Sequence, residues 1–317
     1  MLIKKEINLD LTQLSGQTSQ PPWSLEDGVF KDIVFIKGSP ILFKLKQEGK
    51  FFDFDYEYPL GENLDISQKD ILDKLYWIYD LDFDLAKFYS YLDGNEKLKS
   101  VSSFCNGLRL FIGKNKFEAI LSSISSSNNS IARWTKSISM LKEKWGLKVS
   151  YPSGDFYTFP NINTINSCFV DFEEEFSYSE DILDINDCNN NLKACGFGYR
   201  SSYIKKASDF FTVEMDLNDI SKMSYDEAFE VIQMVPGVGP KVADCILLYG
   251  YNFKEAFPTD VWIKRIVSHL FFDNKDISVP KIREFGIDEF GDYAGYTQLY
   301  LFHYARKSGL MEKLKNK

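Results

Sequence analysis

Apolar and polar side chains alternate with a period of two through much of the first 60 residues. The clearest case is the segment 51–58, FFDFDYEY, in which every second residue from Phe52 is aromatic and the residues between them are acidic. This alternation is typical of a half-buried antiparallel strand. Upstream, the segment 32–54 contains three strand-like runs separated by turn-forming or charged residues at 38–40 and 48–50. We therefore predict a twisted antiparallel β-meander near the N-terminus.

From about residue 67 the spacing of apolar side chains changes to three and four residues, as in a helix. This pattern runs through residues 68–92 and returns on both sides of the polar stretch SSSNNS at residues 125–130. It occurs again in residues 224–235, 241–249, 258–271 and 295–309. The sequence thus predicts an α+β fold, with an antiparallel β-domain and short helices over residues 1–95, followed by a helical region over residues 96–317.

The composition indicates a packed protein and gives no sign of a membrane segment. Of the 317 residues, 44% are hydrophobic and 16% aromatic, which is ample for a core. No apolar stretch reaches the length that spans a bilayer, and residues 1–17 lack the features of a signal peptide. We expect a cytoplasmic protein, associated with the nucleoid if its source is bacterial. The five cysteines show no C-x-x-C spacing, so we expect reduced thiols and no metal centre.

The charge distribution gives a mixed indication about nucleic acid as a partner. The net charge of −9 argues against such a partner. However, residues 171–187 hold eight acidic and no basic side chains, whereas residues 133–148 and 306–317 each hold five basic side chains against one acidic. A local basic surface can bind nucleic acid, because binding depends on the local field. Solvated charged faces are the simpler interpretation of either basic run alone.

The segment 236–240, PGVGP, predicts a tight turn between two helices within about residues 224–250. Gly237 and Gly239 permit backbone conformations that side chains disfavour, and they leave backbone N–H groups accessible on either side of Val238. Such groups at a helix N-terminus bind anions such as phosphate, and this geometry can hold a nucleic-acid backbone without recognising its sequence. An ordinary turn between antiparallel helices is the alternative, and it is the stronger interpretation for this turn alone.

Lys241 follows this turn directly and begins an apolar helical segment. Its place in the first helical turn and the burial of its stem would both lower the pKa of the ammonium group, and a neutral amine is a nucleophile. The alternative is a lysine that extends to solvent or binds phosphate. Asp260, 19 residues later, is the candidate partner. Capping of the next helix by Thr259 or Asp260 is the simpler role, and it is compatible with catalysis.

The segment VPGVGPKVADC, followed by PTDV, resembles the helix–hairpin–helix DNA glycosylase superfamily, in which a lysine at this position marks the bifunctional members. Within that superfamily the chain resembles the 8-oxoguanine DNA glycosylases. Further matching segments are LSGQT at residues 14–18, SSSNNSIAR at 125–133, GFGYR at 196–200 and GYTQLYLF at 295–302. Several motifs in one order are much harder to meet by chance than one. The resemblance implies a helix–hairpin–helix glycosylase core behind the β-domain.

The resemblance also implies a reaction. Lys241 would attack the sugar C1′ of a damaged nucleotide, and Asp260 would stabilise the charge that develops on the sugar. The Schiff base that follows would undergo β-elimination, without a metal or other cofactor. An enzyme of this kind has to extrude its target base from the duplex.

Four residues match those that the family uses where the base leaves the duplex. Asn128 would fill the gap, Arg133 and Arg200 would hydrogen-bond the estranged cytosine, and Tyr199 would act as a wedge beside them. Each has a plainer interpretation when it is taken alone. Asn128 would then cap a loop, the two arginines would bind phosphate, and Tyr199 would belong to the core.

Four further residues match the family's base pocket. Phe302 and Cys245 would lie on the two faces of the base, Gln298 would bind its Watson–Crick edge, and the carbonyl of Gly16 would accept the N7 proton that only the lesion carries. Lys241 and Cys245 are one helical turn apart, so we expect an ammonium–thiolate pair. Outside this family, a Phe and a Gln spaced by four are more often core and surface residues, and a loop glycine usually marks a turn.

The sequence therefore favours a monomeric bifunctional enzyme that removes 8-oxoguanine, preferably opposite cytosine, from double-stranded DNA and then cleaves the abasic strand. The alternatives are a glycosylase of other base specificity and a non-catalytic helix–hairpin–helix DNA-binding protein. Three features depart from the family pattern: SQPPW at residues 19–23, where F-R-W is usual, Ser130 in place of the third Asn of the family's run, and Trp262, where animal members have histidine. We expect DNA binding on one face, with the acidic residues 173–187 turned away.

Overall fold

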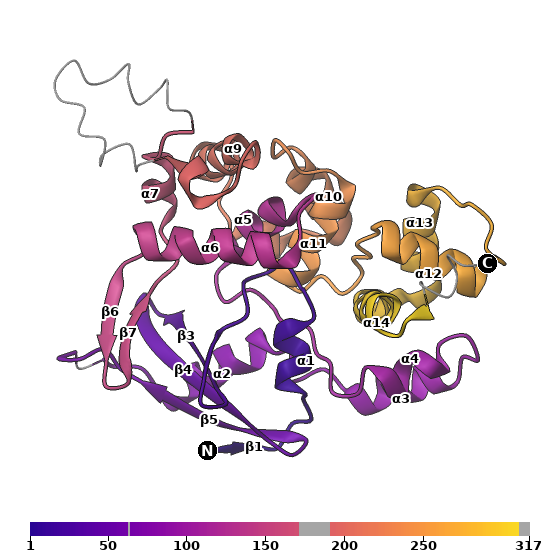
Figure 1. Ribbon diagram of the computed structural model, residues 1–317, viewed down its shortest axis with the longest axis horizontal. Helices are drawn as coiled ribbons and strands as arrows, with labels where there is room; N and C mark the ends of the chain where they lie inside the picture. The colour runs from indigo at the N-terminus through magenta and orange to yellow at the C-terminus, as the bar shows by residue number, and fades with distance from the viewer. Residues whose placement is uncertain (63, 171–190, 311–317) are drawn as a thin grey trace.

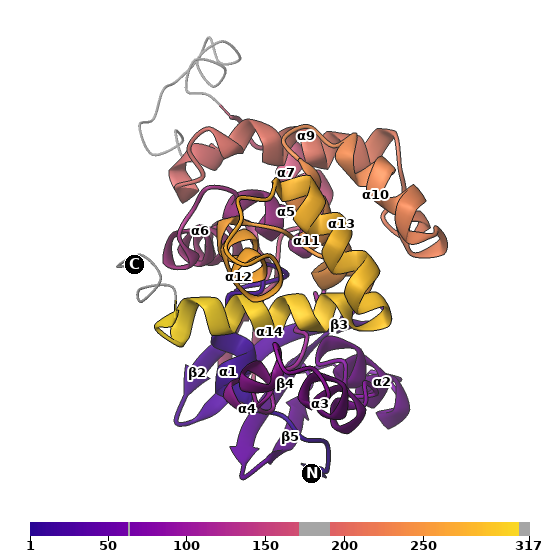
Figure 2. The same cartoon turned by 90° about the vertical axis from the view of Figure 1, so that its right-hand side faces the viewer.

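The structure is a computed structural model that describes residues 1–62, 64–170 and 191–310. The acidic residues 173–187, which we expected to turn away from DNA, lie outside the described residues. The described chain forms a sheet-bearing half and a helical half, which lie one above the other in Figure 1 and Figure 2. This arrangement confirms the α+β fold that the sequence predicts.

A five-stranded antiparallel sheet, in the order β1-β5-β4-β3-β2, forms the N-terminal half. The alternation predicted for residues 51–58 is present, because Phe52 and Phe54 are buried while the aspartates that follow them are exposed. Between β3 and β4, Lys37 and Gly38 both have positive φ, 49° and 84°, as a two-residue hairpin turn requires. The strands are β1 (Leu2–Ile3), β2 (Ser24–Glu26), β3 (Val29–Ile36), β4 (Ser39–Glu48) and β5 (Phe51–Glu57).

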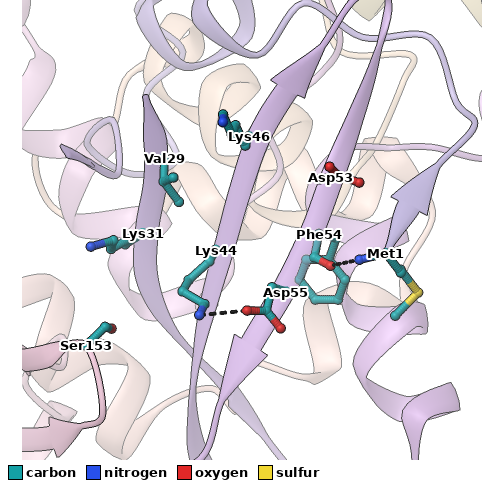
Figure 3. A pocket seen from close by; sticks show the side chains of 9 residues that line it. All are labelled: Met1, Val29, Lys31, Lys44, Lys46, Asp53, Phe54, Asp55 and Ser153. Carbon is teal, nitrogen blue, oxygen red and sulfur yellow. Dashed lines mark hydrogen bonds and ion pairs between the residues drawn. The ribbon is translucent and has the colours of Figure 1, made fainter. Parts of the chain in front are cut away.

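The two faces of this sheet differ in character. The inner face is apolar and packs Phe43 edge-on against Trp23, with 6.4 Å between the ring centroids. On the outer face Lys44 lies 2.7 Å from carboxylate oxygens of both Asp55 and Glu57. Figure 3 shows the shallow pocket beside this lysine, which has a volume of about 480 Å³. Because the acids there neutralise Lys44, we interpret this pocket as part of a charged outer face and not as a site.

A second, two-stranded sheet lies on that outer face. It consists of β6 (Lys148–Tyr151) and β7 (Gly154–Tyr157), and Val149 and Tyr151 pack with Ile33 and Leu42. These residues belong to the region that the sequence predicts to be helical, so this hairpin is a difference from the prediction. Each strand has only four residues, which is too few for alternation to stand out from the neighbouring helical pattern.

The helices follow the 3.6-residue pattern where that pattern was long. The predicted helices at 258–271 and 295–309 are confirmed as α12 and α14. The helices are α1 (Leu9–Leu14), α2 (Gln68–Ile78), α3 (Leu85–Asp93), α4 (Lys99–Phe104), α5 (Lys116–Ser126), α6 (Ile131–Trp145), α7 (Ile162–Asn166), α9 (Arg200–Val213), α10 (Tyr225–Gln233), α11 (Pro240–Tyr251), α12 (Val261–Phe271), α13 (Val279–Phe290) and α14 (Ala294–Lys307), with 3₁₀ turns η1 (Leu192–Cys195), η2 (Asp219–Lys222) and η3 (Gly291–Tyr293).

The predicted helical stretch 68–92 is interrupted at Asp80, which has a φ of 45°. The carboxylate of Asp80 accepts a hydrogen bond from the Tyr296 hydroxyl at 2.9 Å and lies 3.0 Å from the Lys254 ammonium group. Because burial of an unpaired charge is costly, these partners fix the interruption in place. They also tie α14 to the segment between α2 and α3.

Helix α11 is the centre of the helical half. Its residues from Val242 to Tyr251 are all buried, and it packs on α5, which is buried from Phe117 to Ser126. A helix that is buried on every side is expected in the middle of a core, and the one buried carboxylate in this stretch, that of Asp244, lies 2.7 Å from the guanidinium group of Arg283. Helix α14 crosses between the other helices and the sheet (Figure 2), so the last described helix contacts both halves.

A buried ionic cluster joins the sheet to the helices. Lys114 lies 2.8 Å from Asp32 of β3 and 3.0 Å from Glu118 of α5, and Lys142 of α6 lies 2.8 Å from Asp32. Burial alone would raise the pKa of Asp32, but the two lysines lower it to about 2. The cluster therefore fixes α5 and α6, which border the site described next, relative to the sheet.

Candidate functional site

A cavity of about 940 Å³ opens where five segments of the chain meet. These segments are the loop after α1, the α5–α6 connection, the α10–α11 turn, the start of α12 and the end of α14. Every one of the motifs that the sequence analysis singled out except GFGYR contributes to its wall. The lining residues are Gly16, Thr18, Ser126, Ser127, Asn128, Asn129, Ser130, Ile131, Trp134, Gly237, Gly239, Pro240, Lys241, Val242, Thr259, Asp260, Val261, Trp262, Phe302 and Arg306.

The α10–α11 turn presents the backbone that the sequence predicts. Gly237 has a φ of +87°, and a Cβ atom there would lie 2.4 Å from the ring of Tyr203, so glycine is required for two reasons. Gly239 is the N-cap of α11, and Pro240 begins the helix. Among the described residues, no hydrogen bond uses the N–H of Gly237 or Gly239, whereas the N–H of Val238 donates to Val235 and its side chain is buried. Two of the three proposed backbone contacts are therefore accessible donors.

Lys241 lies on the cavity wall as the second residue of α11. The sequence predicted a buried stem, and the side chain is half-buried. Within the described part of the chain, the ammonium group of Lys241 forms no ion pair, although Asp260 lines the same cavity, and the lysine side chain forms a hydrogen bond with Cys245. The cavity thus holds an amine and a carboxylate that face one space without neutralising each other directly.

Asp260 is the N-cap of α12, so the predicted capping role is confirmed. Its Oδ1 accepts hydrogen bonds from the backbone N–H groups of Trp262 and Ile263, both at 2.9 Å. Its Oδ2 has no hydrogen bond within the described residues. Next to it, the hydroxyl of Thr259 donates to the carbonyl of Phe257 at 2.9 Å. One oxygen therefore orients the carboxylate while the other stays available.

Cys245 is one turn after Lys241 and is 3% exposed. Burial raises the pKa of its thiol, and the nearby side chains of Lys241 and Thr18 only partly oppose this effect. The group is therefore a neutral thiol at pH 7. The raised pKa favours the thiol over the thiolate, so it does not support the expected ammonium–thiolate pair with Lys241.

Gln298 and Phe302 both belong to α14 but differ in their surroundings. Gln298 is buried, its Nε2 donates to the carbonyl of Pro258 at 2.9 Å, and its Oε1 accepts from the Tyr249 hydroxyl at 3.2 Å. Phe302 lines the cavity directly. Gln298 therefore fixes the segment that precedes Asp260. One hydrogen of its amide group and one acceptor position on its oxygen remain for another partner.

Gly16 reaches the cavity because the next residue anchors its loop. Gln17 donates from Nε2 to the carbonyl of Arg109 at 2.9 Å and accepts from the N–H of Phe111 at 2.7 Å. Gly16 has a φ of +88°, and a Cβ atom there would lie 2.4 Å from Cδ1 of Ile131. The loop that contains Gly16 thus packs directly on the first residue of α6.

The four residues assigned to the gap and the opposite base lie on two adjoining segments. Asn128 is exposed, with a φ of 47°, and Arg133 is exposed in the first turn of α6. Tyr199 is 56% exposed, and the Arg200 guanidinium group lies 4.4 Å from its ring centroid. Arg200 is buried and donates to the carbonyls of Ser127 at 2.7 Å and Asn128 at 2.8 Å. It therefore holds the loop that presents Asn128.

Thr18 and Arg306 are among the cavity residues that sequence reasoning missed. The hydroxyl of Thr18 shares a hydrogen bond of 3.0 Å with Ser123 of α5, which explains one of several buried serines on that helix. The guanidinium group of Arg306 lies over the ring of Phe302, which comes four residues earlier in α14, with 4.9 Å between the guanidinium carbon and the ring centroid. The i,i+4 spacing was the available signal for Arg306, whereas the run of serines gave no indication of which one would contact Thr18.

Neither a metal-binding cluster nor a membrane-spanning helix is present among the described residues. No group of three or more His, Cys, Asp or Glu side chains there is arranged to hold a metal ion. Likewise, none of the helices described is both long enough and apolar enough to cross a membrane.

Comparison with known protein families assigns both halves of the chain. Residues 121–287 match the model of the HhH-GPD superfamily base excision DNA repair proteins, and residues 1–120 match the model of the 8-oxoguanine DNA glycosylase N-terminal domain. The chain belongs to the HhH-GPD superfamily. This assignment confirms the resemblance that the hairpin, Lys241 and Asp260 indicated.

Individual relatives of this superfamily member cover nearly its whole length. A probable N-glycosylase/DNA lyase of Methanothermobacter thermautotrophicus is 39% identical over 310 residues, 98% of this chain and 97% of the relative. The 8-oxoguanine glycosylase/lyase of Clostridium acetobutylicum, solved with double-stranded DNA containing cytosine opposite 8-oxoguanine, has a TM-score of 0.77 and 25% identity, covering 98% of each chain. A 3-methyladenine DNA glycosylase of Archaeoglobus fulgidus has a TM-score of 0.76 at 22% identity, covering 97% of this chain and 98% of that one, and shares the fold.

Proposed function

We propose that this protein is a bifunctional DNA repair enzyme that excises 8-oxoguanine from double-stranded DNA and then cleaves the abasic strand. The observation that supports this proposal most strongly is the single cavity lined by Lys241, Asp260 and the glycine turn. The match of residues 1–120 to the 8-oxoguanine glycosylase N-terminal domain supports the choice of base. The likeness to the 3-methyladenine enzyme concerns the fold and therefore carries no weight in that choice.

Lys241 is the proposed nucleophile. The lone pair of its neutral amine attacks C1′ of the extruded nucleotide, and the electrons of the glycosidic bond leave with the oxidised base. The base takes up a proton, the amine loses one, and opening of the sugar ring gives a Schiff base between Lys241 and C1′. Loss of a C2′ proton then expels the 3′ phosphate by β-elimination. These steps are amine attack and proton transfers, so no metal or cofactor takes part.

Asp260 is the proposed electrostatic partner. A carboxylate near the sugar stabilises the positive charge that develops there as the base departs. Because its Oδ1 is held by two backbone N–H groups, the carboxylate is oriented before the substrate arrives. Its Oδ2 is the oxygen we assign to the sugar and to proton transfer at Lys241.

The base pocket is proposed to form between Phe302 and Cys245, with Gly16 and Gln298 at the edges of the base. A neutral, buried thiol suits this role, because the flat face of a base packs better on a polarisable uncharged group than on a desolvated ion. The carbonyl of Gly16 would accept the N7 proton of 8-oxoguanine, which guanine lacks. The free amide hydrogen of Gln298 would bind the Watson–Crick edge.

The outer rim is proposed to bind the duplex. Asn128 fills the gap, Tyr199 wedges beside it, and Arg133 and Arg200 hydrogen-bond the estranged cytosine. Arg200 holds the Asn128 loop in the absence of DNA, so cytosine would have to share or exchange these donors. The N–H groups of Gly237 and Gly239 bind phosphate on the damaged strand. We further propose that the enzyme acts as a monomer in the cytoplasm, associated with the nucleoid if its source is bacterial.

The test of this function is cleavage of matched duplexes that differ at one base. We expect strand cleavage at 8-oxoguanine opposite cytosine, none at guanine, and slower excision when adenine, guanine or thymine lies opposite the lesion. Gel analysis under single-turnover conditions measures each rate. Binding without any cleavage would favour a DNA-binding protein, and faster excision of an alkylated purine or an oxidised pyrimidine would favour a glycosylase of other specificity.

A further inference from the structure

Arg306 occupies an unusual position for an arginine in the last turn of a helix. Its guanidinium group lies over the ring of Phe302, with 4.9 Å from the central carbon to the ring centroid, and its Nη1 donates to the carbonyl of Ser15 at 3.2 Å. It lines the cavity together with Lys241 and Asp260. One side chain thus contacts both the aromatic ring of α14 and the loop that contains Gly16.

The surroundings of Arg306 indicate a tight joint. A Cβ atom on Gly16 would lie 3.2 Å from its Nη1, so loop and guanidinium group are in close approach. Burial lowers the pKa of Arg306, and the negative charge of Asp260 opposes that effect. The guanidinium group is therefore partly desolvated and within the field of the carboxylate that we assign to catalysis.

Two simpler roles do not account for this position. A positive charge in the last turn of α14 favours the helix dipole, but Lys307 supplies such a charge while remaining exposed. A phosphate-binding arginine would extend into solvent, whereas Arg306 is half-buried and points back along the helix to Phe302. The planar guanidinium group can stack on a ring and donate in its own plane at the same time, which a lysine cannot do.

We propose that Arg306 is a positioning residue of the base pocket. By contacting both the Gly16 loop and Phe302, Arg306 sets the distance between the pocket walls that receive the oxidised base. This inference rests on the proposed function, because this distance matters only if a base enters the pocket. The residue acts on base recognition and not on the chemistry of the sugar. Its loss should therefore impair excision of 8-oxoguanine more than nicking of an abasic site, where no base has to be held.

Three variants test the inference: Arg306→Leu, Arg306→Lys and, as the matched control, Lys307→Leu, which removes one positive charge from the same helical turn. Single-turnover rates are measured on an 8-oxoguanine duplex and on a preformed abasic duplex. Because a small misplacement of a bound group costs about tenfold to a hundredfold in rate, we expect Arg306→Leu to lose that much excision but little abasic nicking. Arg306→Lys should keep most of the defect, and Lys307→Leu should act on both duplexes like the wild type.

Several results would overturn this role. Equal losses on the two duplexes would assign Arg306 to DNA binding or to folding, and thermal unfolding of the same variants separates these two. Full activity of Arg306→Lys would show that charge alone matters. If the wild-type enzyme nicks abasic DNA but leaves 8-oxoguanine in place, the proposed substrate is wrong, and the role proposed for Arg306 in the base pocket is then wrong as well. If the wild type excises the lesion and the Arg306 variants do so equally well, only the present inference is wrong.

Discussion

Asp260 shows how one side chain can serve the fold and the reaction at once. Its Oδ1 completes the first turn of α12 by accepting two backbone N–H groups, and helix caps of this kind are common for aspartate. The cap fixes the carboxylate in one orientation on the cavity wall. Catalysis then needs only the charge of the group, since its position is already determined by the helix.

This double duty predicts that stability and activity can be separated at Asp260. Asp260→Asn keeps an oxygen that can cap α12 but removes the charge, so we expect nearly unchanged stability and an excision rate lower by about a hundredfold. Asp260→Ala removes the cap as well and should also lower the free energy of unfolding by about 1 kcal/mol. Chemical denaturation and single-turnover kinetics measure the two effects. If Asp260→Asn excised the base at the wild-type rate, Asp260 would be only a cap.

Sequence motifs reveal a site residue when the residues that position it lie close to it in the chain. Lys241 and Asp260 could be found because each lies at a helix start with a recognisable preceding turn. For Arg306 the only signal in the sequence was its spacing from Phe302, and for Thr18 there was none, because their contacts with Ser15 and Ser123 cross long separations in sequence. Contacts of that kind depend on tertiary packing, which single-sequence patterns do not contain.

At the scale of elements, prediction succeeded where a pattern persisted. Strands β3, β4 and β5 and helices α12 and α14 each extend over seven or more residues, so a period could be recognised. The β6–β7 hairpin was missed because its strands are short, and the break between α2 and α3 was missed because it depends on Asp80. That residue adopts a positive φ while its carboxylate binds Tyr296 and Lys254. Neither partner lies near Asp80 in the sequence.

Helix α5 shows at the element scale how serine side chains can lie inside a core. Ser122, Ser123 and Ser125 are fully buried. Ser125 donates to the carbonyl of Ser122, and Ser123 bonds Thr18. Small polar residues can enter a core when local partners satisfy them, as they do for Ser123 and Ser125. The hydroxyl of Ser122 has no hydrogen-bond partner among the described residues. On the same helix Ala119 lies close to Gly250 of α11, since a Cβ atom on that glycine would lie only 3.2 Å from the Cβ atom of Ala119. Small residues at this contact allow α5 and α11 to pack closely.

At the scale of the whole molecule, the ionic cluster around Lys114 couples the two halves. Asp32 belongs to the sheet, Glu118 and Lys142 belong to helices that border the cavity, and Lys114 lies between the two carboxylates. Removing one member of a buried group of charges leaves the others uncompensated, which is strongly destabilising. The relative position of the sheet and the cavity walls therefore depends on these charges.

The pKa of Asp32 predicts a specific dependence of stability on pH. Because the two lysines lower this pKa from an ordinary value of 3.8 to about 2, the carboxylate stabilises the folded state above about pH 4 and this contribution is lost as pH falls to 2. The wild type should exceed Asp32→Asn by on the order of 2 kcal/mol at neutral pH. The difference should shrink between pH 4 and 2, as measured by denaturant unfolding. A difference that stays constant over that range would show that Asp32 stabilises the protein by packing alone.

The central claim is that the amine of Lys241 forms a covalent bond with the sugar of the damaged nucleotide. The most direct measurement is borohydride reduction of the enzyme on an 8-oxoguanine duplex, followed by proteolysis and mass spectrometry of the DNA-linked peptide. We predict that the adduct lies on Lys241, that Lys241→Gln abolishes trapping, and that Lys281→Gln, which replaces an exposed lysine of α13 outside the cavity, traps as the wild type does. An adduct on another amine, or trapping that survives in Lys241→Gln, would contradict the account.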